Sequence, residues 1–224
     1  MVNKEKCDPK LGLAVQEHLI SLGLDTPVTD KVNQDRLAKL DKIVPAFETI
    51  VGNLGLDMND DSIQDTPRRL AKMYVDELTW GLDYNNFPKC TAVENKMNYK
   101  DQFVLERGVQ VMSLCEHHFV TIDGFANIAY IPNKHVLGLS KLNRITQFFS
   151  KRPQIQERLT EQIKEAISFV AQTADVAVVI KAAHYCVKSR GIQDVGSDTL
   201  TASFGGVFQD VSSDIRKEFL SCCR

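Results

Sequence analysis

The feature that most constrains the fold is the order of segments in the second half of this 224-residue chain. Four stretches are rich in β-branched residues and alternate between apolar and polar side chains, most clearly over residues 125–131, as half-buried strands do. Two stretches with helical spacing lie between the second strand and the third. The strand-like stretches are 103–114, 120–131, 176–188 and 198–208, and the helix-like ones are 139–150 and 155–171. The order ββααββ predicts an α+β fold with helices on one face of an antiparallel sheet.

The first hundred residues show helical patterns alone. Apolar residues recur at helical spacing over 11–22 and 35–54, and Pro45 predicts a kink or break in the second stretch. A Thr-Pro pair at 66–67 predicts the start of a third helix, because a hydroxyl cap followed by proline is typical of a helix N-terminus. We therefore expect an N-terminal helical extension before the sheet.

Composition limits the class of protein. The chain is 43% hydrophobic and 25% charged, as in soluble globular proteins, and we expect a helical extension over residues 1–100 and one domain over residues 101–224. The first residues are polar and no long apolar stretch follows, so we expect a cytoplasmic protein with no membrane partner. The net charge is -2, and basic residues are not interleaved with stacking aromatics, so we expect no nucleic-acid partner.

Cysteine and histidine gather in two short motifs. Cys115 is followed by His117 and His118, and His184 stands two residues before Cys186 on a predicted strand. Side chains two apart on a strand project from the same face, so His184 and Cys186 are expected to point the same way. Six cysteines in an intracellular chain do not indicate a disulfide framework. The clustering favours a metal site.

We expect Cys115, His118 and Cys186 to be the metal ligands. Two thiolates and one imidazole leave a fourth position for water, which is the arrangement of a catalytic zinc that activates water. An alternative is a closed structural site, in which His117 or His184 is the fourth ligand. Ligand type alone does not exclude copper or iron, although mixed thiolate and imidazole ligation suits Zn²⁺ best.

A second motif contains Ser140, Lys141 and Arg144. Lys141 and Arg144 are three residues apart and share a helix face, while Ser140 lies near the helix N-terminus, where backbone N–H groups can hold a phosphate. Arg190, with Lys188, follows the predicted ligand strand and adds positive charge. The alternative is an ordinary solvated helix face.

Two further side chains have both a functional and an ordinary interpretation. Arg69 lies in the first turn of the third helix, where the helix dipole disfavours a cation, so an anionic ligand would explain it, as would simple solvation. Glu157 also lies in a first helical turn, where a carboxylate is favoured without any function. A carboxylate there can also accept two parallel hydrogen bonds from the edge of a planar base.

Together these motifs resemble the GTP cyclohydrolase I family, over residues 60–220. No one motif is strongly specific, but their joint occurrence in this order is. The resemblance is carried by Cys115-Glu116-His117-His118, Ser140-Lys141-Leu142-Asn143-Arg144, Arg152-Pro153-Gln154-Ile155-Gln156-Glu157-Arg158, His184-Tyr185-Cys186 with Arg190-Gly191, Thr66-Pro67-Arg68-Arg69 and Asn95-Lys96-Met97.

The resemblance implies a tunnelling fold (T-fold) ββααββ catalytic domain, a ring-shaped homodecamer and active sites between subunits. It implies conversion of GTP and water to 7,8-dihydroneopterin triphosphate and formate, the first step of tetrahydrofolate and pterin biosynthesis. The implied proton-transfer residues are His117, His184 and Ser140. The implied contacts to the guanine edge are Gln156 and Glu157, and those to the triphosphate are Lys141, Arg144, Arg190 and Arg69, the last from a neighbouring subunit.

Two alternative functions fit parts of these motifs. A zinc-stabilised protein that senses GTP without turnover would have a fourth protein ligand on the metal and would release no formate. Another T-fold enzyme, such as a nitrile reductase, would need a lone nucleophilic cysteine, and the two thiols with a histidine oppose it.

Overall fold

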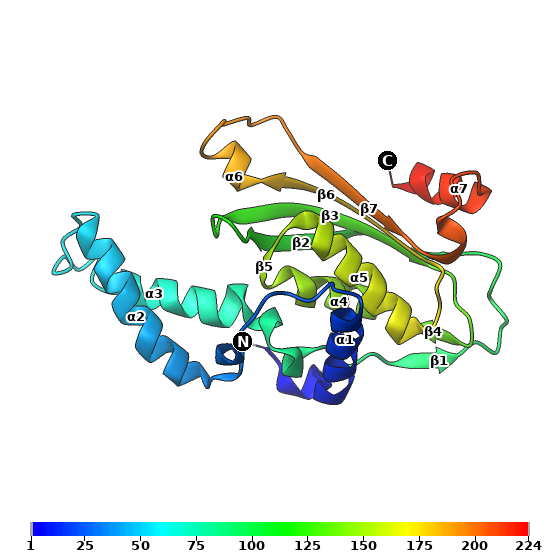
Figure 1. Ribbon diagram of the computed structural model, residues 1–224, viewed down its shortest axis with the longest axis horizontal. Helices are drawn as coiled ribbons and strands as arrows, with labels where there is room; N and C mark the ends of the chain where they lie inside the picture. The colour runs from blue at the N-terminus through cyan, green and yellow to red at the C-terminus, as the bar shows by residue number, and fades with distance from the viewer. Residues whose placement is uncertain (1, 224) are drawn as a thin grey trace.

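The computed structural model describes residues 2–223 and confirms the α+β class: helices pack on a twisted five-stranded sheet, and a helical arm projects to one side (Figure 1). The strands are β2 (Val104–Cys115), β3 (Thr121–Tyr130), β5 (Pro153–Gln154), β6 (Val176–His184) and β7 (Thr199–Phe204). Their order is β5-β2-β3-β6-β7, and the neighbours are antiparallel except for β2 and β5. A small second sheet pairs β1 (Ala92–Glu94) with β4 (His135–Leu137).

One face of the sheet carries the main core. Alternate residues of β6, Val176, Val178 and Ile180, are fully buried against helices. The covering helices are α4 (Ser140–Ser150), α5 (Gln156–Ala171) and α1 (Pro9–Ser21), as Figure 1 shows. The predicted layer of helices on a sheet is therefore present, with α1 as an additional member.

The opposite face is covered at one end by a helix that the sequence patterns did not predict. The residues of β6 that alternate with the core set, Ala177 and Val179, pack near Phe208 and Phe219 in a second buried cluster. Phe219 belongs to α7 (Asp214–Cys222), whose apolar stripe is short. The expectation of helices on one face alone is thus incomplete.

The N-terminal segment is built into the main core. Val15 and Leu19 of α1 are fully buried in the same cluster as the sheet residues. The fully buried guanidinium of Arg152 donates to the hydroxyl of Thr26 at 3.3 Å and to the carbonyl of Gly81. Residues far apart in the sequence therefore meet beneath the sheet.

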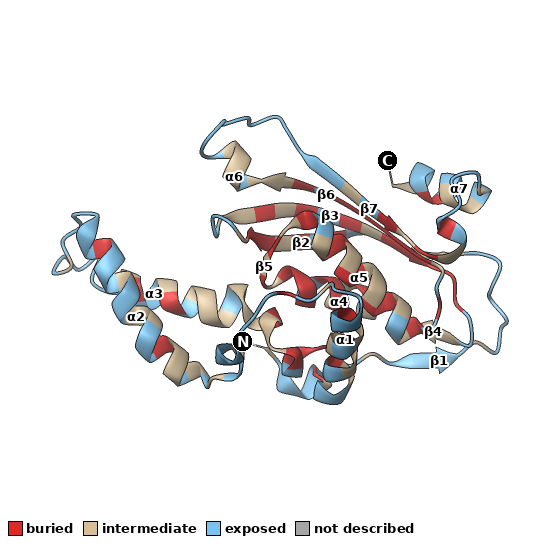
Figure 2. Cartoon of the chain, in the orientation of Figure 1, coloured by how far each residue is buried: buried red, intermediate tan, exposed pale blue. Residues whose placement is uncertain are grey.

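The arm is a pair of helices, α2 (Arg36–Asn53) and α3 (Thr66–Lys72), with exposed and half-exposed residues over most of its length (Figure 2). α2 runs through Pro45 without interruption, so the predicted break is wrong. Proline has no N–H to donate to the carbonyl of Asp41, but Asp41 is exposed, so that carbonyl can bond to water instead. α3 continues as a π-helix, η3 (Met73–Leu78).

Shorter helices complete the described part of the chain. They are η1 (Lys4–Lys6), η2 (Asp30–Asn33), η4 (Trp80–Leu82), η5 (Tyr84–Asn86), α6 (Tyr185–Lys188) and η6 (Gly206–Phe208). Within residues 2–223 no helix combines the length and the apolar character that crossing a membrane requires.

Candidate metal centre

The predicted ligands meet at one end of the sheet. The ligand atoms of Cys115, His118 and Cys186 all lie within 4.8 Å of one another, and Cys115 Sγ is 3.8 Å from His118 Nδ1. Burial raises the pKa of the Cys186 thiol, and the neighbouring Cys115 thiol raises it further. Without a cation, this position therefore opposes thiolate formation; a metal ion supplies the charge that stabilises two thiolates. The donor set fits a metal, and it is the set predicted from spacing.

A tight turn carries the first two predicted ligands. Cys115 ends β2, and its carbonyl accepts a hydrogen bond of 2.8 Å from the Phe119 N–H. The Cys115 N–H in turn donates to the Val120 carbonyl at 2.8 Å. Phe119 has a φ of 54°, which is uncommon for a residue with a side chain. The turn thus brings the Cys115 thiol and the His118 imidazole next to each other.

The third predicted ligand, Cys186, lies on a different element from the one expected. β6 ends at His184, and Cys186 belongs to the short helix α6 rather than to the strand. The argument from strand alternation is therefore wrong in its reason, although Cys186 does join the cluster. His184 pairs with Ile122 of β3, close to the metal turn.

A network of polar side chains supports the turn, and sequence reasoning did not assign these roles. The Arg158 guanidinium donates to the Glu116 carboxylate and, at 3.2 Å, to Gln154 Oε1. The Glu116 N–H donates to the Gln154 carbonyl at 3.1 Å, and Gln154 Nε2 donates to Gln162 Oε1 at 2.8 Å. Helix spacing could have paired Gln154 with Arg158, but the link to Glu116 depends on tertiary structure.

His184 is oriented by Gln156. Three oxygens accept from Gln156 Nε2, those of Ile180, Thr199 and Thr201, at 3.0 to 3.2 Å. The Gln156 carbonyl oxygen, 2.6 Å from His184 Nε2, must then accept, so the proton of the neutral imidazole is on Nε2. Burial lowers the pKa of His184, and the nearby Glu157 carboxylate raises it by a smaller amount. Gln156 is itself buried, with its side chain in contact with protein groups rather than open to a ligand.

The remaining predicted residues at this end are more open. His117 is 67% exposed in its side chain, and its Nε2 is 4.0 Å from Glu116 Oε1. Glu157 is exposed. The exposed Arg190 reaches the cluster itself, since its guanidinium lies 2.7 Å from His118 Nε2.

Four predicted residues lie elsewhere in the chain. β3 runs for ten residues, about 30 Å, from Thr121 beside the metal turn to Tyr130. The Tyr130 hydroxyl accepts from the Leu137 N–H at 2.9 Å, so α4 begins at the far end of the sheet. The four residues are Ser140, Lys141 and Arg144 on α4, and Arg69 on α3, where its guanidinium lies 3.7 Å from Asp65 Oδ2.

In this α+β fold a tight turn and a short helix bring two thiols and an imidazole to one point, with further histidines beside them, and such a cluster is typical of metal-dependent enzymes. The sequence profile of the family described as GTP cyclohydrolase I matches residues 43–224, and the chain belongs to that family.

Its relatives match over nearly their whole length. "GTP cyclohydrolase 1" of Enterobacter sp. (strain 638) is 52% identical over 211 residues, 94% of each chain. The protein of the same name from Haemophilus ducreyi is 51% identical over 92% of this chain and 94% of its own. That from Pectobacterium carotovorum subsp. carotovorum is 52% identical over 96% of each.

Proposed function

We propose that this chain is a GTP cyclohydrolase, which converts GTP and water to 7,8-dihydroneopterin triphosphate and formate at the start of pterin and tetrahydrofolate synthesis. The observation that carries the proposal is the convergence of Cys115, His118 and Cys186 within 4.8 Å in a chain of this family. His117 and His184 flank these residues in the sequence and supply titratable groups beside them.

We propose Zn²⁺ as the metal and the same three residues as its ligands. Two sulfurs and one nitrogen are the donors that zinc prefers, and three protein ligands leave one position for water or substrate. A zinc ion bound there would supply Lewis acidity that lowers the pKa of water to about 7. The turn and α6 hold the donors on one side, and the network through Arg158 and Gln154 keeps the turn in place.

The protein's own groups would then move protons and bind the base. His184, with its Nε2–H donated to Gln156, offers Nδ1 for proton exchange at N7 of guanine. His117, which is largely exposed, would exchange a proton near C8 or at the ribose ring oxygen, and Ser140 would relay one in the later ribose steps. Glu157 would accept the guanine N1–H and 2-amino hydrogens. Gln156 would serve the guanine site through its hold on His184.

The triphosphate would be bound by Arg190 at the metal end and by Lys141, Arg144 and Arg69 from other copies of the chain. Within one chain Lys141 and Arg144 lie on α4, which begins at the far end of the sheet from the metal turn, so the proposed complete site needs an assembly. We propose the T-fold for the sheet and its helices, and a ring-shaped homodecamer with active sites between subunits. Two open sheet edges support this: β7, and β2 before its two-residue pairing with β5.

The division into a helical extension over 1–100 and a catalytic domain over 101–224 stays a proposal. The arm formed by α2 and α3 suits the first part, whereas α1 shares the core of the second.

The test is to incubate purified, zinc-replete protein with GTP and to measure formate together with a pterin chromophore. Both products are expected in equal amounts. Absence of both, with zinc still bound and GTP binding intact, would favour the GTP sensor instead. A fourth protein ligand on zinc, detected by X-ray absorption spectroscopy, would support the same conclusion.

A further inference from the structure

The metal turn touches the helical arm through one aromatic contact. The Tyr74 ring on η3 and the Phe119 ring lie 6.1 Å apart between centroids. The Tyr74 hydroxyl is also 3.4 Å from the Phe119 carbonyl, to which it can donate. Phe119 is 48% exposed, and among the described residues Tyr74 is its aromatic partner. Phe119 directly follows the ligand His118, so this contact lies one residue from the metal site.

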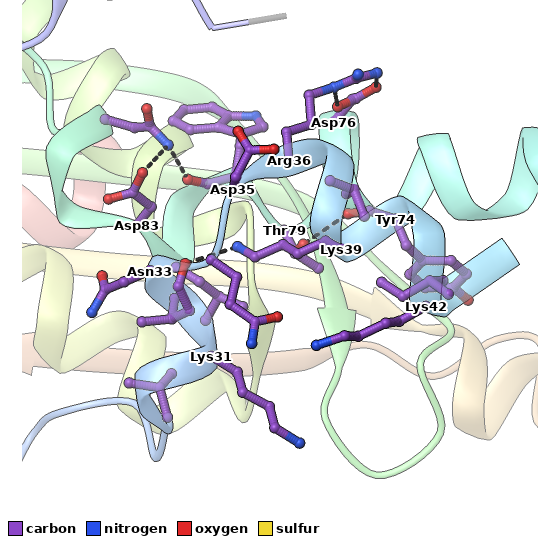
Figure 3. Close-up of a pocket in the computed structure, with 18 of the residues that line it drawn as sticks. Lys31, Asn33, Asp35, Arg36, Lys39, Lys42, Tyr74, Asp76, Thr79 and Asp83 are labelled. Atoms are coloured by element: carbon purple, nitrogen blue, oxygen red, sulfur yellow. Dashed lines mark hydrogen bonds and ion pairs between the residues drawn. The ribbon is translucent and has the colours of Figure 1, made fainter. Parts of the chain in front are cut away.

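Tyr74 is itself held in place by the arm (Figure 3). Phe47 of α2 stacks on it with ring centroids 5.6 Å apart. The Tyr74 carbonyl accepts from the Thr79 hydroxyl at 2.7 Å, which fixes the end of the π-helix. Arg36 donates to both oxygens of Asp76 at 2.5 and 2.6 Å and so ties the start of α2 to the same helix.

The conformation of Phe119 is the part of the turn that needs support. A residue with a side chain in the left-handed region is disfavoured unless its surroundings stabilise it. The Phe119 N–H closes the turn onto the Cys115 carbonyl, so relaxation of Phe119 would open the turn that aligns Cys115 with His118. A groove of about 1200 Å³ beside α2 is lined partly by Phe47, Tyr74 and Phe119, so on this side the Phe119 ring borders open space.

We propose that Tyr74 is a positioning residue for metal binding: it holds Phe119 in the left-handed conformation and thereby couples the helical arm to the affinity of the metal turn. The inference rests on the proposed metal ligands but not on turnover of GTP. Neither Tyr74 nor Phe119 touches the metal or the substrate in this role; each acts through the geometry of the turn.

The test is zinc affinity, measured by competition with a chromogenic chelator under reducing conditions. An aromatic pair contributes on the order of 2- to 10-fold to an equilibrium constant, so Tyr74→Ala should raise the zinc Kd by about that factor. Tyr74→Phe, which keeps the ring, should retain most of the affinity. Tyr99→Ala is the control: Tyr99 is more exposed than the half-buried Tyr74, but its hydroxyl also lies close to a backbone carbonyl, 3.3 Å from that of Phe103, just before the end of β2 that is far from the metal turn.

A double-mutant cycle distinguishes this route from general loosening of the arm. In the Phe119→Ala background, Tyr74→Ala should cause no further loss of zinc affinity, because its partner is gone. The same loss in both backgrounds, or no loss in either, would overturn the proposal.

A metal-independent measurement keeps the inference separate from the proposed function. In metal-free protein, Tyr74→Ala should raise the alkylation rate of Cys115 relative to Cys90 by about the same 2- to 10-fold, since the turn opens more often. An unchanged ratio would also overturn the proposal. If the expected changes in zinc affinity and alkylation rate were found but the unmodified protein released no formate from GTP, only the proposed enzyme activity would be rejected.

Discussion

The metal end of the sheet and the helical arm are held by different kinds of contact. At the metal end, three glutamine side chains are buried: Gln154, Gln156 and Gln162. Their amide groups are hydrogen-bonded to other side chains and to backbone carbonyls. In the arm, an ion pair and an aromatic stack join α2 to η3, and large apolar side chains of α2 such as Leu37 and Ile50 remain exposed. Figure 2 shows that exposed residues are frequent along α2. The metal end is therefore held by buried polar contacts, whereas the arm leaves large apolar side chains exposed.

The largest effect is expected at the metal ligands. Cys186→Ala removes a thiolate from the site and should weaken zinc binding by more than about 100-fold. The loss should be larger than that caused by changing a residue that only hydrogen-bonds to a metal ligand, because a direct bond to the metal is removed. Zinc content after dialysis, measured by plasma mass spectrometry, checks this. His184→Ala, two residues away, is the control and should keep its zinc. Equal zinc loss in both variants would contradict the three-ligand site and favour a closed structural one.

The second prediction concerns the buried network. Gln156→Leu deprives His184 and Thr201 of a partner, so we expect the free energy of unfolding to fall by about 1 to 3 kcal/mol. Urea denaturation measures it. Gln147→Leu is the matched control, because Gln147 is exposed on α4 and should change stability by less than about 0.5 kcal/mol. If both variants were equally stable, the metal end would not depend on this network.

The third prediction separates substrate recognition from stability at the same end. Glu157→Ala should leave the free energy of unfolding nearly unchanged, because Glu157 is exposed. It should reduce the preference for GTP over inosine triphosphate by about 10-fold or more, since hydrogen bonds to a charged group contribute roughly 1.5 to 3 kcal/mol. Comparing kcat/KM for the two nucleotides tests this. An unchanged preference would remove Glu157 from the guanine site.

The smallest effect is expected in the arm. Arg36 pairs with Asp76 but is 40% exposed in its side chain, so Arg36→Ala should lower the free energy of unfolding by less than about 1 kcal/mol. Arg68→Ala, an exposed arginine of α3, serves as the control. Chemical denaturation of both variants gives the comparison. A loss above 2 kcal/mol for Arg36→Ala would mean that the arm is part of the cooperative core.

The sequence predicted the elements with strong periodicity and the residues that gather at the candidate metal centre. It placed α4, α5 and four of the five strands of the main sheet, but not the two-residue strand β5, and it singled out Cys115, His118 and Cys186, because clustered thiols and imidazoles are rare by chance. It missed α7, whose nine residues carry too short an apolar stripe to stand out. It also extended β6 through Cys186, since Tyr185 and Val187 suit a strand as well as the helical turn they form.

Burial of polar side chains was harder to predict. The sequence shows Gln154, Gln156 and Arg158 as ordinary polar residues near a helix start, and nothing local indicates that two of them lie inside the protein. Their partners, such as Glu116 and Thr201, are about forty residues distant. Glu157, which the resemblance assigns to the guanine edge, is exposed within one chain. Such contacts follow from the tertiary arrangement alone.

The buried guanidinium of Arg152 also has a consequence for how the chain folds during its synthesis. Its partner Thr26 precedes it by 126 residues, and α1 packs against a sheet whose strand β6 is made later still. The apolar side chains of α1 therefore cannot be buried until most of the chain has left the ribosome. Contacts of such long sequence separation slow folding, so we expect a protein that folds late and depends on chaperones while its first helix is unprotected.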